Sequence, residues 1–432
     1  MATIYVSKDG DDDDGTGSGG NPYLTIAKAV SEAGANDKII IGAGTYVESN
    51  IDPGNVSGVK IRNNGDGQVI IDGSAGSGSL AGNTILPYND WVIDGSTGSN
   101  LQNIEIIGGS ESCVRGQGGT NRSFSLKHVV LTGRGAGNLS DEDNSTKYAI
   151  KFPSTSTIRN ILIRNFINGA VTYTGNPGPI YFRNNIIYKI GNSLNSEAIV
   201  SHEDAANEIF FNTIVGCTGT IGIDTDAAVN PTIKNNLLAA NKFSASGIRF
   251  RGNTNVLNNC VHSTLFSPSG GAYDDTGSGS LDSSNLTSDP ILNGTNPWDE
   301  TFNSGVNGDF SVTPSVAPYD GSPRTTAGSP VEGAGVYLGA TLTTDFSGST
   351  RPRPPSIGAL RVTPNILFTT APTGDGLANK VQEDFIINHF NRISDETPRN
   401  VGQIPFSKAV LGPSNLKDRT TAYKLEKGKE GS

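Results

Sequence analysis

The chain has 432 residues, a formal net charge of −10 and a hydrophobic content of 34%. This acidic balance argues against nucleic acid or an anionic membrane as the main partner, because both favour a clustered basic surface. The low apolar content, together with 55 glycines, is typical of short strands and many turns. No stretch reaches the length of a membrane span, and residues 1–6 lack the basic and apolar regions of an export signal. We therefore expect no membrane insertion and no signal peptide.

Residues 1–37 are predicted to form an N-terminal cap. A first strand and an acidic, glycine-rich loop precede a short helix whose apolar residues share one face, namely Ile26, Ala29, Val30 and Ala33. The run of four aspartates at 11–14 raises the hypothesis of a calcium site. It lacks the glycine and the glutamate that complete an EF-hand loop, so a solvated acidic loop is favoured and no metal is predicted.

Residues 38–266 repeat one short unit, a polar residue followed by an aliphatic run. The unit recurs about every 25 residues and starts at Asn103, His128, Asn160, Asn185, Asn212, Asn236 and Asn259. A period of this size indicates a solenoid, and a second aliphatic run in each unit predicts at least two sheets along it. Asparagine tolerates left-handed backbone at a corner, and its amide can bond the equivalent residue one coil away. We therefore predict an internal asparagine ladder in a parallel β-helix.

Three cysteines, Cys113, Cys217 and Cys260, lie in or beside the aliphatic runs and show no metal-ligand spacing. They are predicted to be buried small hydrophobic residues rather than a metal or redox site. No cofactor is predicted.

The sequence changes character twice after the repeats. Residues 267–362 contain less regular strands and are predicted to be an irregular, β-rich end of the β-helix. Residues 363–432 are predicted to be a C-terminal helix and an extended docking arm. The apolar face of this helix is predicted to anchor the chain by docking on a partner surface, through Leu377, Val381, Phe385, Ile386, Phe390 and Ile393.

Two stretches of the sequence carry a family resemblance. The opening contains Thr25-Ile26 and Gly42-Ala43-Gly44-Thr45-Tyr46, and the end contains Gly308-Asp309-Phe310, Arg351-Pro352 and Ile357-Gly358-Ala359. They resemble the pectate-lyase-like superfamily of right-handed parallel β-helices, in particular its phage spike and virion members. The resemblance implies an all-β, right-handed parallel β-helix with a capping helix. It does not imply a reaction, because the superfamily holds lyases, hydrolases, epimerases, adhesins and phage spikes.

Polar residues at the ends of the second strands are candidates for chemistry. If Ile199, Ile221 and Ile248 point inward, three catalytic candidates fall near one strand end on successive coils, namely His202, Asp224 and Arg251. Candidate glycan-binding residues surround them, namely Glu203, Asp204, Asp226, Arg249 and Lys151. The alternative is a solvated polar row that closes turns.

The leading functional hypothesis is a structural virion protein of a tailed bacteriophage. We expect a homotrimeric tail spike, fibre or capsid decoration, anchored to other virion proteins through residues 364–432, made in the host cytoplasm, released by lysis and in contact with host surface glycans. One alternative is a polysaccharide lyase or glycoside hydrolase that acts on bacterial surface polysaccharide. Another is a passive glycan-binding adhesin. We expect binding rather than turnover, because no catalytic motif of the superfamily is present in the repeats.

Overall fold

The computed structural model describes residues 1–74, 82–96, 103–116, 123–134, 146–151, 155–172, 179–188, 190–191, 197–201, 207–225, 231–239, 241–251, 255–262, 271–277, 281–288, 290, 292–293, 324–325, 329–346 and 350–359. The chain divides into two compact units, Met1–Asn365 and Ile366–Ser432. The second unit, with all six predicted anchoring residues, lies outside the described residues. No described helix is long and apolar enough to span a bilayer.

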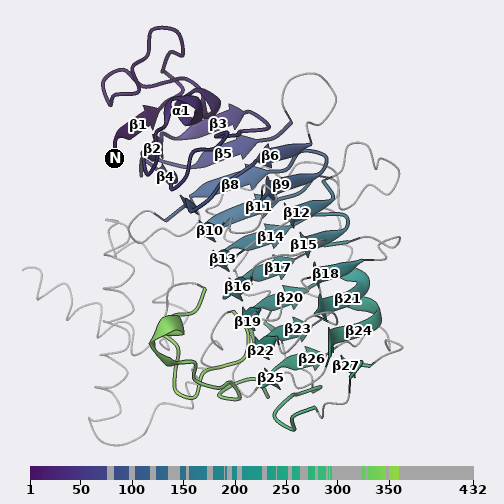
Figure 1. The fold of residues 1–432 in the computed structure, drawn as a ribbon. Helices are drawn as coiled ribbons and strands as arrows, with labels where there is room; N and C mark the ends of the chain where they lie inside the picture. The colour runs from purple at the N-terminus through teal and green to yellow at the C-terminus, as the bar shows by residue number, and fades with distance from the viewer. Residues whose placement is uncertain are drawn as a thin grey trace, which may run out of the picture. The chain divides into compact units, whose positions relative to one another are not determined.

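Three parallel sheets run through the first unit (Figure 1). Sheet 1 contains β1 (Thr3–Val6), β2 (Lys38–Ile41), β4 (Lys60–Asn63), β7 (Trp91–Asp94), β10 (Phe124–Lys127), β13 (Ser156–Arg159), β16 (Ile180–Arg183), β19 (Glu208–Phe210), β22 (Thr232–Lys234) and β25 (Asn255–Leu257). Sheet 2 contains β3 (Gly44–Val47), β5 (Val69–Asp72), β8 (Ile104–Ile107), β11 (Val129–Thr132), β14 (Leu162–Arg164), β17 (Ile186–Tyr188), β20 (Thr213–Val215), β23 (Leu237–Ala239) and β26 (Cys260–His262). Sheet 3 contains β6 (Asn83–Ile85), β9 (Ser112–Arg115), β12 (Tyr148–Lys151), β15 (Gly169–Thr172), β18 (Ala198–Ser201), β21 (Thr218–Asp224), β24 (Lys242–Phe250) and β27 (Tyr273–Asp275).

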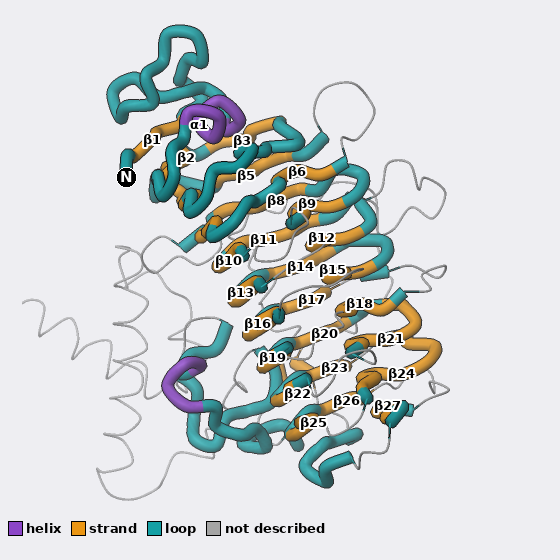
Figure 2. Tube along the Cα trace, viewed as in Figure 1, coloured by secondary structure: helices purple, strands orange, loops and turns teal. Residues whose placement is uncertain are grey.

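From β7 onward the chain visits sheet 1, sheet 2 and sheet 3 in turn, and each strand pairs with its equivalent one coil later. Figure 2 shows the resulting stack of strands, with the helix α1 (Ile26–Glu32) beside the first of them. Two further short elements are the antiparallel pair β28 (Leu292–Asn293) and β29 (Arg324–Thr325) and the 3₁₀ helix η3 (Gly339–Leu342). The predicted right-handed parallel β-helix is confirmed.

The core is built from aliphatic stacks, one residue per coil. In sheet 1, Ile93, Leu126 and Ile158 are consecutive partners across the strands, and all are buried. Ile106, Leu131 and Ile163 form the matching stack in sheet 2. The three cysteines are buried and unpaired with one another, and burial raises the pKa of the Cys217 thiol to about 12. Their predicted role as small core residues is confirmed.

Two adjacent residues, rather than one, form the corner between sheet 1 and sheet 2. The first has left-handed backbone, with φ of 60° at both Asn184 and Asn235. The second, at Asn212 and Asn236, is fully buried and carries the ladder. The predicted combination of both roles in one asparagine holds at Asn184, which has left-handed backbone and donates from Nδ2 to Oδ1 of Asn160 (2.7 Å) one coil earlier. From Asn185 to Asn285 a second, buried row follows the left-handed one and carries the ladder.

Each ladder asparagine joins three coils. Asn236 donates from Nδ2 to the carbonyl of Ile209 on the preceding coil (2.7 Å) and to Oδ1 of Asn259 on the next (3.0 Å). Its own Oδ1 accepts from the backbone amide of Asn212 (3.0 Å). The ladder includes Asn185, Asn212, Asn236, Asn259 and Asn285. It satisfies backbone groups that would otherwise be buried without partners.

The outer corner asparagines hold a different part of the chain. We call residues 329–346 and 350–359 the C-terminal strap (green in Figure 1). Asn235 donates from Nδ2 to the carbonyl of Val336 (2.8 Å), and Asn184 accepts from the buried guanidinium of Arg351 (2.6 Å). That guanidinium lies 3.9 Å from the ring centroid of Phe211.

The strap covers the outer face of sheet 2. Two apolar clusters form there, one joining Phe346 and Ala359 to sheet 2 and the other joining Val331 and Ile357 to later strands of the same sheet. The sheet residues in these clusters are Val130, Leu162, Ile186, Leu237, Ala239 and Cys260. This part of segment 267–362 thus packs across existing coils, because the apolar outer residues of these sheet 2 strands need cover.

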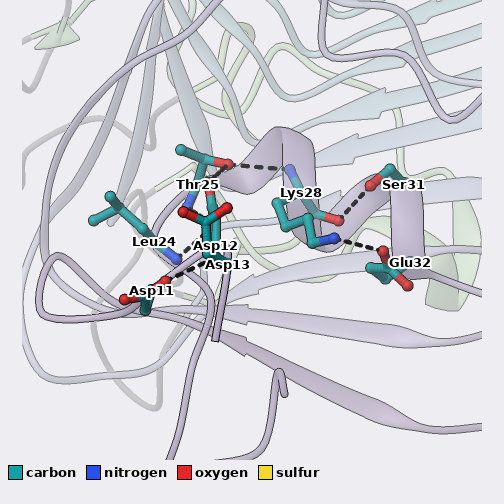
Figure 3. Close-up of polar contacts among 8 residues, drawn as sticks. All are labelled: Asp11, Asp12, Asp13, Leu24, Thr25, Lys28, Ser31 and Glu32. Atoms are coloured by element: carbon teal, nitrogen blue, oxygen red, sulfur yellow. Dashed lines mark hydrogen bonds and ion pairs between the residues drawn. The ribbon is translucent and has the colours of Figure 1, made fainter. Parts of the chain in front are cut away.

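The N-terminal cap is fastened by carboxylates (Figure 3). Asp12 accepts from the amides of Leu24 (2.8 Å) and Thr25 (3.0 Å) and from the Thr25 hydroxyl. Thr25 is the N-cap of α1 and accepts from the amide of Lys28 (3.1 Å). Glu48 accepts from the amides of Ile26 and Ala27, the first residues of the helix. These bonds pair the free amides of the helix start and hold the helix against the first coil.

The acidic loop before the helix folds on itself. Asp11 accepts from the amides of Asp13 (2.7 Å) and Asp14 (3.0 Å), and these hydrogen bonds hold the pKa of its carboxyl below the usual range. Within the described part of the chain, no group of three or more acidic, His or Cys residues is arranged to hold a metal ion.

Replacing a ladder asparagine should destabilise the whole first unit. We expect Asn236→Ala to lower the free energy of unfolding by about 2–4 kcal/mol, because the amide of Asn212 and the carbonyl of Ile209 lose buried partners. Urea denaturation followed by circular dichroism measures this change. The matched control is Asn255→Ala, at an exposed position of β25, which should stay within about 0.5 kcal/mol of the wild type. Equal losses in the two variants would contradict the ladder.

Two neighbouring aspartates should differ in their effect on the cap. We expect Asp12→Ala to speed amide exchange in residues 24–32 about tenfold, because it removes the acceptor for two amides and the Thr25 hydroxyl. Asp13→Ala, on an exposed residue of the same run, should leave exchange unchanged. Hydrogen–deuterium exchange read by mass spectrometry measures both effects. If the acidic run were merely a solvated loop, the two variants would exchange at the same rate.

Candidate functional site

The outer side of sheet 3 carries a row of polar residues at the strand ends. Val114, Ile150 and Ile223 are buried, and the residue after each points outward because side chains alternate along a strand. These outward positions are in register on successive strands, at Arg115, Lys151, Thr172, Ser201, Asp224, Arg249 and Asp274. All but one of them are half-buried, and Arg115 is exposed.

The strand register changes the predicted catalytic group. Asp224 lies opposite Arg249, and the guanidinium donates to both carboxylate oxygens, from Nε (3.1 Å) and Nη2 (2.6 Å). Arg251, predicted to lie beside Asp224, falls two residues past that position and is exposed. The predicted alignment is therefore wrong at Arg251. The cause is visible in the register: Ile248 pairs with Ile223, whereas the prediction aligned Ile248 with Ile221, and both Ile221 and Ile223 are buried.

Four predicted site residues cannot be placed beside this pair. His202, Glu203, Asp204 and Asp226 lie outside the described residues. Lys151 is described, on β12, three strands away from Asp224 on β21 in the order of sheet 3.

A denser polar cluster surrounds Lys151. We call it the sheet 3 platform, and its half-buried members are Glu111, Lys147, Tyr148, Lys151, Asn168 and Glu197. The Glu111 carboxylate accepts from Nζ of Lys147 (2.9 Å) and of Lys151 (2.8 Å). The Tyr148 hydroxyl donates to Glu197 (2.5 Å), which also accepts from Nδ2 of Asn168 (3.1 Å). The platform residues thus lie on or directly before four neighbouring strands, β9, β12, β15 and β18.

Protonation states in the platform follow from these contacts. Burial opposes ionisation of Glu111, but the hydrogen bonds from Lys151 and Lys147 outweigh it and hold its pKa below the usual range. Burial, assisted by the Glu197 carboxylate, raises the pKa of Tyr148 to about 12. At neutral pH Glu111 is therefore an anion and Tyr148 a neutral donor. Neither exchanges protons readily near neutrality, so the platform suits hydrogen bonding better than acid–base catalysis.

The platform matches the chemistry of a sugar ligand. Carboxylate, amide, ammonium and phenol groups can each bond a hydroxyl, and an aromatic ring offers an apolar surface. Lys151 already lies over the Tyr148 ring, 5.6 Å from its centroid. The sequence prediction included Lys151 alone. Four of the other platform residues could have been found from their positions in the sequence. Each stands directly before a strand of sheet 3, namely Glu111, Lys147, Asn168 and Glu197.

Comparison with known proteins reveals likeness of structure alone. No family model and no curated protein sequence matches this chain. The crystal structure of pectate lyase Pel9A is similar with a TM-score of 0.48 and 13% identity, covering 84% of this chain and 97% of that one. The complex of XylC with xylose is similar with a TM-score of 0.39 and 13% identity, covering 63% and 69%. At this identity the similarity concerns the fold, and the chemistry must be argued from the residues of this chain.

Proposed function

We propose that this protein is a structural β-helix of a bacteriophage particle that binds bacterial surface glycans through the sheet 3 platform. The observation that carries the glycan proposal is the set of interlocked polar groups around Glu111 and Tyr148 on neighbouring strands. Their mutual hydrogen bonds fix the side chains before a ligand arrives, which lowers the entropic cost of binding. A rigid, regularly spaced surface suits a repeating polymer.

Binding without turnover is favoured because the carboxylates of sheet 3 are held in ion pairs. Glu111 is held as an anion by two lysines, and Asp224 is held by a bidentate contact with Arg249. A general acid needs a raised carboxyl pKa, and a general base needs freedom to take a proton. The polysaccharide lyase or glycoside hydrolase remains the alternative, and direct assay of turnover decides between them.

The virion setting is proposed from the sequence. The motifs at both ends of the β-helix resemble phage members of the superfamily, and the apolar stripe from Leu377 to Ile393 fits docking on another surface. We propose a homotrimer, displayed on the particle and held there by residues 364–432. Head and tail positions both satisfy this proposal.

Removing one platform cation should weaken glycan binding. On an array of bacterial surface polysaccharides, we expect Lys151→Ala to bind its ligand roughly tenfold more weakly than the wild type, because Glu111 and the sugar both lose a donor. The control Lys242→Ala, at an exposed position of β24 in the same sheet, should bind like the wild type. The same samples are tested for released oligosaccharides. Release that disappears in Asp224→Asn and Arg249→Gln would favour the enzyme over the binding protein.

Deleting residues 364–432 should leave the β-helix folded but prevent its incorporation into phage particles. We expect the shortened protein to keep its β-sheet circular dichroism, because the described strands all precede the deletion. It should be missing from purified particles, measured by mass spectrometry after production during infection. Normal incorporation of the shortened chain would contradict the anchoring role.

A further inference from the structure

The outer face of sheet 1 carries a row of cations. The inward residues Ile93, Leu126 and Ile158 are buried, so the residue after each points outward. In register along the sheet these outward residues are Arg62, Asp94, Lys127, Arg159, Arg183, Phe210 and Lys234. We call them the sheet 1 row. Five of these seven residues are basic, in a chain whose net charge is −10.

The acidic neighbours of the row do not neutralise it. Asp94 accepts from Nδ1 of His128 (3.0 Å) and from the Ser96 hydroxyl (2.8 Å), and its contact with Arg62 is long at 3.9 Å. Glu208, on the adjacent row, pairs with Arg183. Over the part of the chain that the structure describes, no ion pair within 4.0 Å involves Lys127, Arg159 or Lys234.

Several polar atoms of this face lack a partner. The Nε atoms of Arg159 and Arg183 are shielded from solvent and make no hydrogen bond, and the same holds for the hydroxyl of Ser125 on β10. Burial, reinforced by the charge of Arg159, lowers the pKa of Lys127. Half-buried cations that repel one another and leave donors unsatisfied raise the free energy of the empty face. An anionic ligand would relieve the repulsion between the cations.

We infer that the sheet 1 row binds a linear anionic polysaccharide laid along the solenoid axis. Successive strands are about 4.8 Å apart, so a straight polymer meets a new side chain of the row at each coil. The parallel row on the same face adds the hydroxyl groups of Thr157, Tyr181 and Thr232. Cations and hydroxyls side by side match the carboxylates and hydroxyls of a polyuronate.

The aromatic residues of this face favour a sugar polymer over single-stranded nucleic acid. Sequence-independent binding of single strands needs open rings on which bases stack. Here the guanidinium of Arg183 lies 5.0 Å from the ring centroid of Tyr181 and 5.6 Å from that of Phe210, so both rings already have a stacking partner. The site lies on a different sheet from the platform and does not depend on it.

The test uses the full chain and alginate, a linear polyuronate, with neutral dextran for comparison. We expect the wild type to bind alginate and not dextran at low ionic strength, and to lose most of this binding at about 0.5 M salt, where charges are screened over a few ångströms. The double variant Lys127→Gln/Arg159→Gln should bind alginate roughly tenfold more weakly. The control Lys242→Gln should bind normally. Circular dichroism and thermal melting verify that each variant is folded.

Three outcomes would overturn the inference. The first is absence of alginate binding by folded wild-type protein. The second is equal binding by the double variant. The third is preference for single-stranded DNA over alginate through the same two residues. Lys151→Ala should leave alginate binding intact, so failure of the platform proposal and failure of this one give different results.

Discussion

The later coils of this solenoid are tied to one another at the corner between sheets 1 and 2 by buried carboxamides, from Asn185 to Asn285. A turn there leaves main-chain amides and carbonyls without strand partners, in a place that water does not reach. Asn212, Asn236 and Asn259 supply those partners from side chains that are themselves fully buried. An unsatisfied buried group costs about 1–3 kcal/mol, so loss of the asparagines would cost stability at each of these later coils. The regular stacking of the coils from Asn185 onward depends on this corner.

With the core and the corner fixed, the outer faces are free to differ. The later strands of sheet 2 carry an apolar outer patch that is covered by the strap, which the left-handed asparagines hold through Val336 and Arg351. Sheets 1 and 3 instead carry charged residues outside. A β-helix places equivalent side chains of distant sequence segments one strand apart, so each outer face forms a straight row suited to a long ligand. Polymer binding is therefore a natural use of this architecture.

The sequence predicted the parts of the molecule that repeat. Aliphatic runs, each preceded by a polar residue, mark the coils. The cap helix is marked by its apolar residues Ile26, Ala29 and Val30, which are buried. The two-residue corner escaped prediction because asparagine occupies both positions, as at Asn184 and Asn185. The strap escaped because its contacts join residues far apart in the chain, such as Arg351 and Asn184.

The candidate sites were harder to predict than the scaffold. Placing Arg249 rather than Arg251 beside Asp224 requires knowing that Ile248 pairs with Ile223 and not with Ile221, and both of these candidates are buried aliphatic residues. The platform and the sheet 1 row are invisible to composition, because an acidic chain can still gather Lys127, Arg159 and Arg183 from three coils. Their residues become neighbours only when the strands are stacked.

A double-mutant cycle between Asn212 and Asn236 tests the corner most directly. The two side chains bond one another at 2.9 Å, and Asn236 also accepts from the amide of Asn212. Free energies of unfolding are measured for the wild type, each alanine variant and the double variant. The ladder predicts a coupling energy of about 1–3 kcal/mol, with the second substitution costing less than the first. Additive losses, with coupling below about 0.5 kcal/mol, would contradict the claim that the ladder joins the coils.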